Sequence, residues 1–207
     1  MEIVKIEPLS KTKLRLTAQD GRTLLVTRRD AALCGLPAVA TFSVSEQTWE
    51  ALREAQRTAV LHRCGDLLSG RDYTSAKLRG KLAADGYPQE AVDYAVAAME
   101  EAHYLDDKRY AQTYIRYHLR DKSRLRMKQD LTARGVPAEV IAAALEEAAD
   151  EEDLDGCEAA QIQALLEKKR FDSENATWQE CQKMMAFLCR RGFSQDTVRR
   201  VMRGGEK

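Results

Sequence analysis

The sequence predicts a mainly α-helical protein, with three tandem three-helix repeats forming an elongated curved array after a small N-terminal segment that contains a β-hairpin. The chief observation is a pattern that occurs three times: leucine, then four residues later glycine, an apolar residue, and proline or serine. Its glycines are 49 and then 57 residues apart, which is typical of stacked copies of one helical unit. The copies are Leu82-x-x-x-Gly86-Tyr87-Pro88, Leu131-x-x-x-Gly135-Val136-Pro137 and Leu188-x-x-x-Gly192-Phe193-Ser194.

The second observation is that other positions agree between the copies when they are counted from the glycine. The residue nine positions before it is basic each time, and three further positions are apolar each time. The basic residues are Lys77, Arg126 and Lys183; the apolar sets are Leu78, Met127 and Met184, then Val92, Ile141 and Val198, then Val96, Leu145 and Met202.

The repeated glycine predicts a helix end. Glycine readily adopts the left-handed conformation that follows a helix in the Schellman motif, and the next, apolar residue then touches the last turn. In the first copy, Gly86 would be this residue and Tyr87 would contact Leu82. Proline or serine follows because either residue suits the start of a new helix, so each copy is expected to be helix, glycine stop, helix.

Residues 1–45 form a different region, the N-terminal β element. Two β-prone runs, residues 14–17 and 23–27, flank Asp20-Gly21, a dipeptide that is typical of hairpin turns. A short helical or loop excursion is expected through Gly35-Leu36-Pro37. Because an isolated hairpin is barely stable, this region should pack against the helices that follow.

From Ser45 onward the pattern is helical, and the expected repeats are residues 46–104, 105–153 and 154–207. Asp106 is expected to cap the first helix of the second repeat, which explains the paired carboxylates Asp106 and Asp107 without acid or base catalysis. The expected helices are 46–69, 74–85 and 88–103, then 107–120, 124–134 and 138–151, then 155–170, 176–191 and 195–203.

Composition argues against several classes of protein. The longest apolar run, residues 140–145, is too short to span a membrane, and the N-terminus lacks the order of a secretion signal, so a cytoplasmic protein is expected. The five cysteines form no CxxC pair, which argues against a disulfide framework or a zinc site.

No catalytic group or cofactor is predicted. Gly65-x-x-x-x-Gly70 has the spacing of a phosphate-binding loop, but Arg71-Asp72 follows where lysine and serine or threonine are needed. The acidic residues from Glu151 resemble a calcium loop, yet Ile162 occupies the position of its bidentate carboxylate. The protein is therefore expected not to be an enzyme and to bind no metal.

The formal charge is zero, but the charges are segregated along the chain. Residues 108–134 carry nine basic side chains and two acidic ones, whereas residues 139–158 carry nine acidic side chains and no lysine or arginine. Two interpretations are open: the two stretches face different partners, or they are solvated faces that screen one another.

The basic residues of the helix 107–120 have the spacing of one narrow stripe, formed by Arg109, Arg116 and Arg120. Tyr110, Tyr114 and Tyr117 have core spacing and are expected to be buried, although tyrosines near arginines also suit base stacking. A second basic set closes the chain and includes Lys168-Lys169-Arg170, Arg199-Arg200 and Arg203. Such rows can follow the phosphates of a nucleic acid or a carboxylate-lined groove.

Several phrases together resemble the bacterial RecX regulatory proteins over residues 60–203. They are Leu67-Leu68-Ser69-x-Arg71-x-Tyr73-Thr74, Lys77-Leu78-x-x-x-Leu82, Tyr104-Leu105-Asp106-Asp107-x-Arg109-Tyr110-Ala111 and Leu188-x-Arg190-Arg191-Gly192-Phe193-Ser194. One departure is Thr74-x-x-Lys77-Leu78, where the family usually has Ser-x-x-Glu-Leu. It affects the expected capping box of that helix but not the helix.

The resemblance implies a monomeric, cytoplasmic modulator of the RecA recombinase that lies along the RecA–single-stranded DNA filament and restrains recombination, DNA repair and the SOS response. The alternative is a helical-repeat protein that binds nucleic acid directly, without RecA. In the first case single-stranded DNA is contacted directly or through RecA. The residues expected to contact the filament are Lys77, Arg109, Arg116, Arg120, Arg124, Arg126, Lys128, Lys183, Arg190 and Arg191.

Overall fold

The structure, a computed structural model, describes residues 1–36, 42–151, 153–173 and 175–204. The chain divides into two compact units, Met1–Asp106 and Asp107–Lys207. Within the described residues, the first unit holds an antiparallel sheet, a short helix and three longer helices, and the second holds six helices.

The sheet of the first unit has four strands in the order β3-β2-β1-β4. The predicted hairpin joins β2 to β3, and Gly21 turns the chain with a φ of +85°. The hairpin prediction is therefore confirmed, whereas the two-residue strand β4 is too short to show a pattern in the sequence. The strands are β1 (Glu2–Pro8), β2 (Lys13–Ala18), β3 (Thr23–Thr27) and β4 (Phe42–Ser43).

A short helix, α1 (Arg28–Leu33), follows β3 because the hydroxyl of Thr27 accepts a hydrogen bond from the backbone N–H of Asp30. Gly35, with a φ of +66°, follows the helix. The expected excursion therefore contains a helix that begins earlier than the sequence indicated. Its last residue, Pro37, lies outside the described residues.

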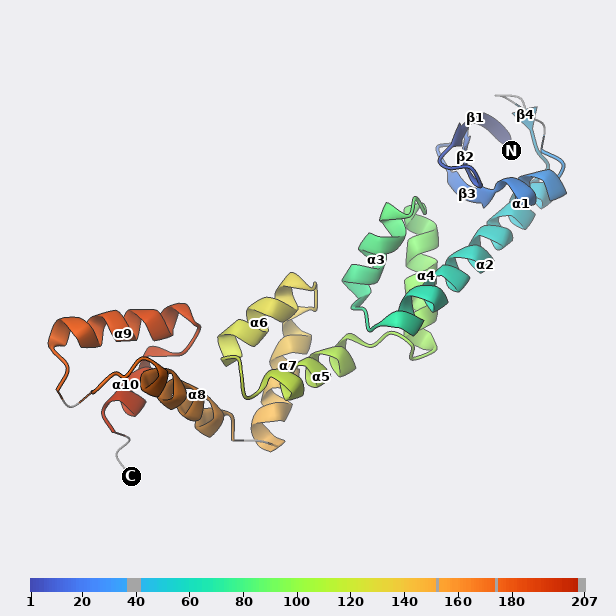
Figure 1. Ribbon diagram of the computed structural model, residues 1–207. Coiled ribbons are helices and arrows are strands. Elements are labelled where there is room, and N and C mark those ends of the chain that lie inside the picture. Colours follow the sequence, from blue (N-terminus) through green and yellow to red (C-terminus); the bar gives the residue numbers. More distant parts are fainter. Residues whose placement is uncertain (37–41, 152, 174, 205–207) are drawn as a thin grey trace. The chain divides into compact units, whose positions relative to one another are not determined.

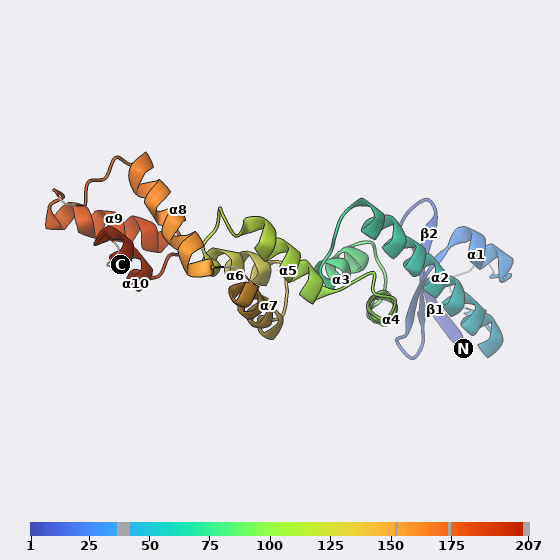
Figure 2. The same cartoon turned by 90° about the horizontal axis from the view of Figure 1, so that it is seen from below.

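The sheet packs against the N-terminal half of α2 (Glu46–Gly70), as expected for a hairpin that needs support (Figure 2). Trp49 and Leu52 share a core with strand residues such as Ile3. Further along α2, the buried side chain of Gln56 accepts a hydrogen bond of 2.5 Å from the backbone N–H of Leu25. This bond ties β3 to the helix and satisfies a buried amide.

All nine predicted repeat helices are present, and their ends differ from the predicted ones by two residues at most. Figure 1 shows α3 and α4 beside the C-terminal part of α2, and separate groups formed by α5, α6 and α7 and by α8, α9 and α10. The helices after α2 are α3 (Ser75–Ala84), α4 (Gln89–Glu101), α5 (Asp107–His118), α6 (Arg124–Ala133), α7 (Ala138–Glu151), α8 (Leu154–Lys168), α9 (Trp178–Arg190) and α10 (Gln195–Met202).

Each helix triplet has its own hydrophobic core, and the repeated apolar positions supply it. Leu78 is buried in the first core, and Met127 in the second. The third core is less covered, because only Val198 of the set Met184, Val198 and Met202 is fully buried. Three small cores arise because each triplet can bury its own apolar faces.

The glycine stops have the predicted Schellman geometry. Gly86, Gly135 and Gly192 have φ values of +94°, +79° and +93°. In each copy the N–H of the next residue donates to the carbonyl of the repeated leucine, as from Tyr87 to Leu82 at 3.2 Å. The same bond measures 3.2 Å in the second copy and 3.3 Å in the third.

Helix α3, where the sequence differs from the usual Ser-x-x-Glu-Leu pattern, has part of a capping box. The hydroxyl of Thr74 accepts a hydrogen bond of 3.2 Å from the N–H of Lys77. The reciprocal bond of a capping box requires glutamate or glutamine three residues after the cap, and Lys77 cannot supply it. The helix α3 therefore forms with half of the usual cap.

Candidate functional site

The predicted contact residues lie in both compact units. Lys77 is exposed on α3 in the first unit, whereas the other nine belong to the second unit. Within the second unit, some of these nine residues form ion pairs, some line a cavity, and others lie elsewhere on the surface of their helices.

The stripe on α5 is partly neutralised by the acidic run. Arg116 lies 3.7 Å from the carboxylate of Glu151 on α7, and Lys108 lies 2.5 Å from that of Glu147. Both pairs are largely exposed, so each contributes little to stability. They nevertheless support the interpretation in which the basic and acidic stretches screen one another.

Arg124 is a structural residue at the junction between the second and third repeats. Its guanidinium lies 2.6 Å from Asp155 and 3.0 Å from Glu158, both on α8. Glu158 is buried and also accepts a hydrogen bond of 2.7 Å from the N–H of Arg124 at the start of α6. Burial alone would lower the pKa of Arg124, but the hydrogen bonds and charges of Glu158 and Asp155 together outweigh it, and the pKa is raised.

A second internal network surrounds Asp130 on α6. Its carboxylate accepts hydrogen bonds from the Tyr114 hydroxyl at 2.7 Å and the Lys122 ammonium at 2.9 Å. Arg126 lies 3.2 Å from the other oxygen, yet more than half of its side chain remains exposed. Burial opposes ionisation of Asp130, but these bonds prevail and lower its pKa.

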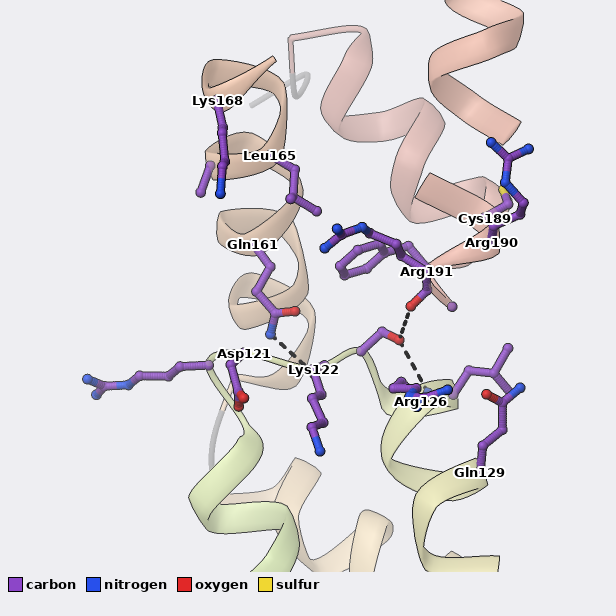
Figure 3. Close-up of a pocket in the computed structure, with 16 residues that line it drawn as sticks. Asp121, Lys122, Arg126, Gln129, Gln161, Leu165, Lys168, Cys189, Arg190 and Arg191 are labelled. Atoms are coloured by element: carbon purple, nitrogen blue, oxygen red, sulfur yellow. Dashed lines mark hydrogen bonds between the residues drawn. The ribbon is translucent and has the colours of Figure 1, made fainter. Parts of the chain in front are cut away.

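A cavity of about 520 Å³ opens between α6, α8 and the C-terminal end of α9 (Figure 3). Among the residues that the structure describes, six basic side chains line it together with one acidic side chain, that of Asp121. Apolar side chains such as Leu165 and Phe193 form part of its wall. The basic residues are Arg120, Lys122, Arg126, Lys168, Arg190 and Arg191.

Several cavity cations lack a counter-charge from the protein. In the part of the chain that the structure describes, no carboxylate forms an ion pair with Arg120, Lys168 or Arg191, nor with Arg190. The guanidinium of Arg191 instead lies 5.1 Å from the centre of the Phe187 ring. Neighbouring cations without a counter-charge form a surface that attracts phosphate or carboxylate groups.

Hydrogen bonds connect the second and third repeats on two sides of the cavity. Gln161 donates hydrogen bonds to the carbonyls of Leu119 and Lys122, at 2.9 and 3.3 Å, just after α5. Figure 3 shows the bond to Lys122. Across the cavity, the Ser123 hydroxyl donates to the carbonyl of Arg191 at 3.0 Å. These bonds fix the second and third repeats against each other and so fix the spacing of the cavity cations.

The remaining predicted residues do not line this cavity. Arg109 and Arg116 lie on α5, Lys128 is exposed on α6, and Lys183 is exposed on α9. Four of the ten predicted residues line the cavity: Arg120, Arg126, Arg190 and Arg191.

Sequence reasoning missed two residues that belong beside the predicted set. Lys168 belongs to the basic run at the end of its helix, and nothing in the sequence indicates that it lines the same cavity as Arg191. Tyr117 was expected to be buried, and this prediction is wrong: its side chain is 81% exposed. The core of the second repeat takes Tyr114 and Ile115 instead.

The fold and the cavity define a protein of tandem three-helix repeats with a cavity lined by cations. Its three repeats match the family models for the first, second and third three-helix domains of RecX, over residues 61–98, 106–145 and 157–202. The chain therefore belongs to the RecX family of regulatory proteins. This confirms the family resemblance and the predicted repeat fold.

Similar curated proteins are also named regulatory protein RecX. The chain is 34% identical to the regulatory protein RecX of Trichlorobacter lovleyi over 65% of its own length and 88% of that protein. It is 36% identical to that of Vibrio vulnificus, over 64% of this chain and 84% of the relative. A crystal structure of regulatory protein RecX, 21% identical, shares the fold with a TM-score of 0.63 and covers 97% of this chain and 98% of that one. Among the described helices, none has the length and apolar character of a membrane span.

Proposed function

We propose that this protein binds the RecA–single-stranded DNA filament and inhibits RecA in recombination, DNA repair and the SOS response. Membership of a family of regulatory proteins supports a regulatory role. The observation that carries the binding proposal is the cavity lined by Arg120, Lys168 and Arg191, whose charges no carboxylate of the described chain neutralises. A polyanion supplies the missing counter-charge.

The protein acts by occupying the filament as a cytoplasmic monomer, without catalysis of its own. The cavity cations hold the filament, while Lys77, Arg109, Lys128 and Lys183 extend the contact. Arg124 contributes indirectly, because its pairing with Glu158 keeps the second and third repeats in register. Arg116 has a smaller part than its place in the stripe suggested, since Glu151 competes for its charge.

Charge reversal of two cavity cations tests this proposal. The double variant Lys168→Glu/Arg191→Glu should lose inhibition of RecA-driven strand exchange, because it replaces two attractive groups by two repulsive ones. The control variant Arg199→Glu/Arg200→Glu makes the same charge change on exposed residues of α10 in the same repeat. It should inhibit nearly as well as the unaltered protein. Full inhibition by the cavity variant would remove the proposed site.

Direct binding to nucleic acid without RecA is the second candidate, and the cation-lined cavity favours it too. Binding to bare single-stranded DNA, to RecA alone and to the assembled filament separates the two. Markedly tighter binding to the filament supports the RecA-dependent function. Equal affinity for bare DNA and filament, with a steep dependence on salt, supports direct binding.

A further inference from the structure

A group of aromatic rings extends from the core of the second repeat to its surface, beside the cationic cavity. The ring centres of Tyr114 and His118 are 4.4 Å apart, and those of His118 and Tyr117 are 5.0 Å apart in an edge-to-face arrangement. Tyr114 is buried and His118 is half-buried, whereas Tyr117 is 81% exposed. The outermost ring is therefore supported from below but left uncovered.

Contacts also connect this exposed ring to the wall of the cavity. The Nδ1 atom of His118 lies 3.1 Å from the carboxylate of Asp121, and Asp121 lines the cavity together with Arg120. Tyr117 lies in the last turn of α5 (Asp107–His118), and Arg120 follows in the turn just after that helix. An aromatic face and unneutralised cations thus occupy neighbouring positions.

An exposed aromatic residue by itself requires no functional explanation. Tyr117 differs because its ring is held by His118, itself anchored by Asp121 and Tyr114, and because cations lie nearby. Nucleic-acid strands that are unpaired offer the complementary pair of features, a phosphate backbone and free base faces. In duplex DNA the base faces are stacked on each other and cannot contact Tyr117.

We propose that Tyr117 is a stacking platform for a base of single-stranded nucleic acid whose phosphates occupy the cavity formed by Arg120, Lys168 and Arg191. This inference rests on the proposed function and deepens it, because it assigns the second repeat to the DNA strand of the filament. The stacking contact favours single-stranded over double-stranded nucleic acid, whereas the cavity cations attract phosphates of either.

The test compares two oligonucleotides of equal length and charge, an oligothymidylate and an abasic strand, by fluorescence anisotropy. The unaltered protein should bind the oligothymidylate more tightly. Tyr117→Ala should weaken that binding on the order of tenfold and leave binding to the abasic strand unchanged, since only the stacked base is lost. Tyr117→Phe keeps the ring and should bind like the unaltered protein.

Lys168→Glu/Arg191→Glu should weaken binding to both strands, which separates the phosphate contacts from the stacking contact. Equal binding of the oligothymidylate by Tyr117→Ala and the unaltered protein would overturn the inference, and so would absence of binding to both bare strands. Circular dichroism of each variant tests folding, which the exposed position of Tyr117 should leave intact. If the strand-binding results hold but RecA is not inhibited, the proposed function fails while the stacking site stands.

Discussion

Ser123 and Gly192 meet at the point where the second and third repeats touch. A Cβ atom added at Gly192 would lie 2.5 Å from the Ser123 hydroxyl oxygen, which itself donates a hydrogen bond to the carbonyl of Arg191. The same hydroxyl accepts a hydrogen bond from the N–H of Arg126 and so caps α6. The glycine that ends α9 is therefore also the residue that lets the two repeats approach closely.

Gly192→Ala should destabilise the protein by about 3 kcal/mol, because it combines a left-handed alanine with overpacking at the repeat junction. Gly21→Ala is the matched control: Gly21 has a similar φ of +85° but open space around a Cβ atom. It should cost only about 1 kcal/mol. Urea denaturation followed by circular dichroism measures both values. Equal losses for the two variants would show that the close approach to Ser123 has no energetic effect.

Glu158→Gln should destabilise the protein by roughly 3 kcal/mol, because it removes the negative charge of the buried partner of Arg124. Asp155→Asn serves as the comparison: its carboxylate pairs with the same guanidinium, but 59% of its side chain is exposed, against 6% for Glu158. The exposed pair should contribute less than about 1 kcal/mol. Thermal denaturation of both variants provides the measurement, and a larger loss for Asp155→Asn would contradict the assigned role of Glu158.

Asp130 should make stability depend on pH in the acid range. Its pKa in the folded protein is below the ordinary value of 3.8, so its contribution is present above that value and is lost as the pH falls through the lower, folded pKa. Asp130→Asn should therefore cost about 2 kcal/mol at neutral pH and progressively less below pH 3.8. Denaturation curves of both proteins between neutral and acid pH give this difference, and a gap that stays constant down to the lowest pH would refute the prediction.

Removing cavity cations should reduce the salt dependence of binding to single-stranded DNA. For a single strand, each phosphate that the protein no longer neutralises makes the slope of log K against log salt shallower by about 0.7, so Lys168→Ala/Arg191→Ala should reduce it by about 1.4. Titrations at several salt concentrations measure the slope. An unchanged slope would show that these two side chains do not contact phosphates, whatever their effect on affinity.

Much of the fold follows from local sequence signals. The helix ends agree with the prediction because glycine, proline, serine and threonine act on the backbone within one turn of their own position. Gly86 and Ser194 illustrate this: one terminates a helix through its own φ, and the other caps the next helix through its own hydroxyl. Such effects depend little on the rest of the molecule.

The sequence by itself thus determined three helical repeats, their glycine stops and the hairpin, because these arise from neighbouring residues. Only the tertiary structure decided which cations stay available. Helical spacing shows which face of α6 carries Arg124 and which face of α5 carries Tyr117. It does not show what covers those faces. The contact of Glu158 on α8 with the start of α6 neutralised Arg124, the core of the second repeat left Tyr117 uncovered, and the third repeat brought Lys168 and Arg191 to one cavity.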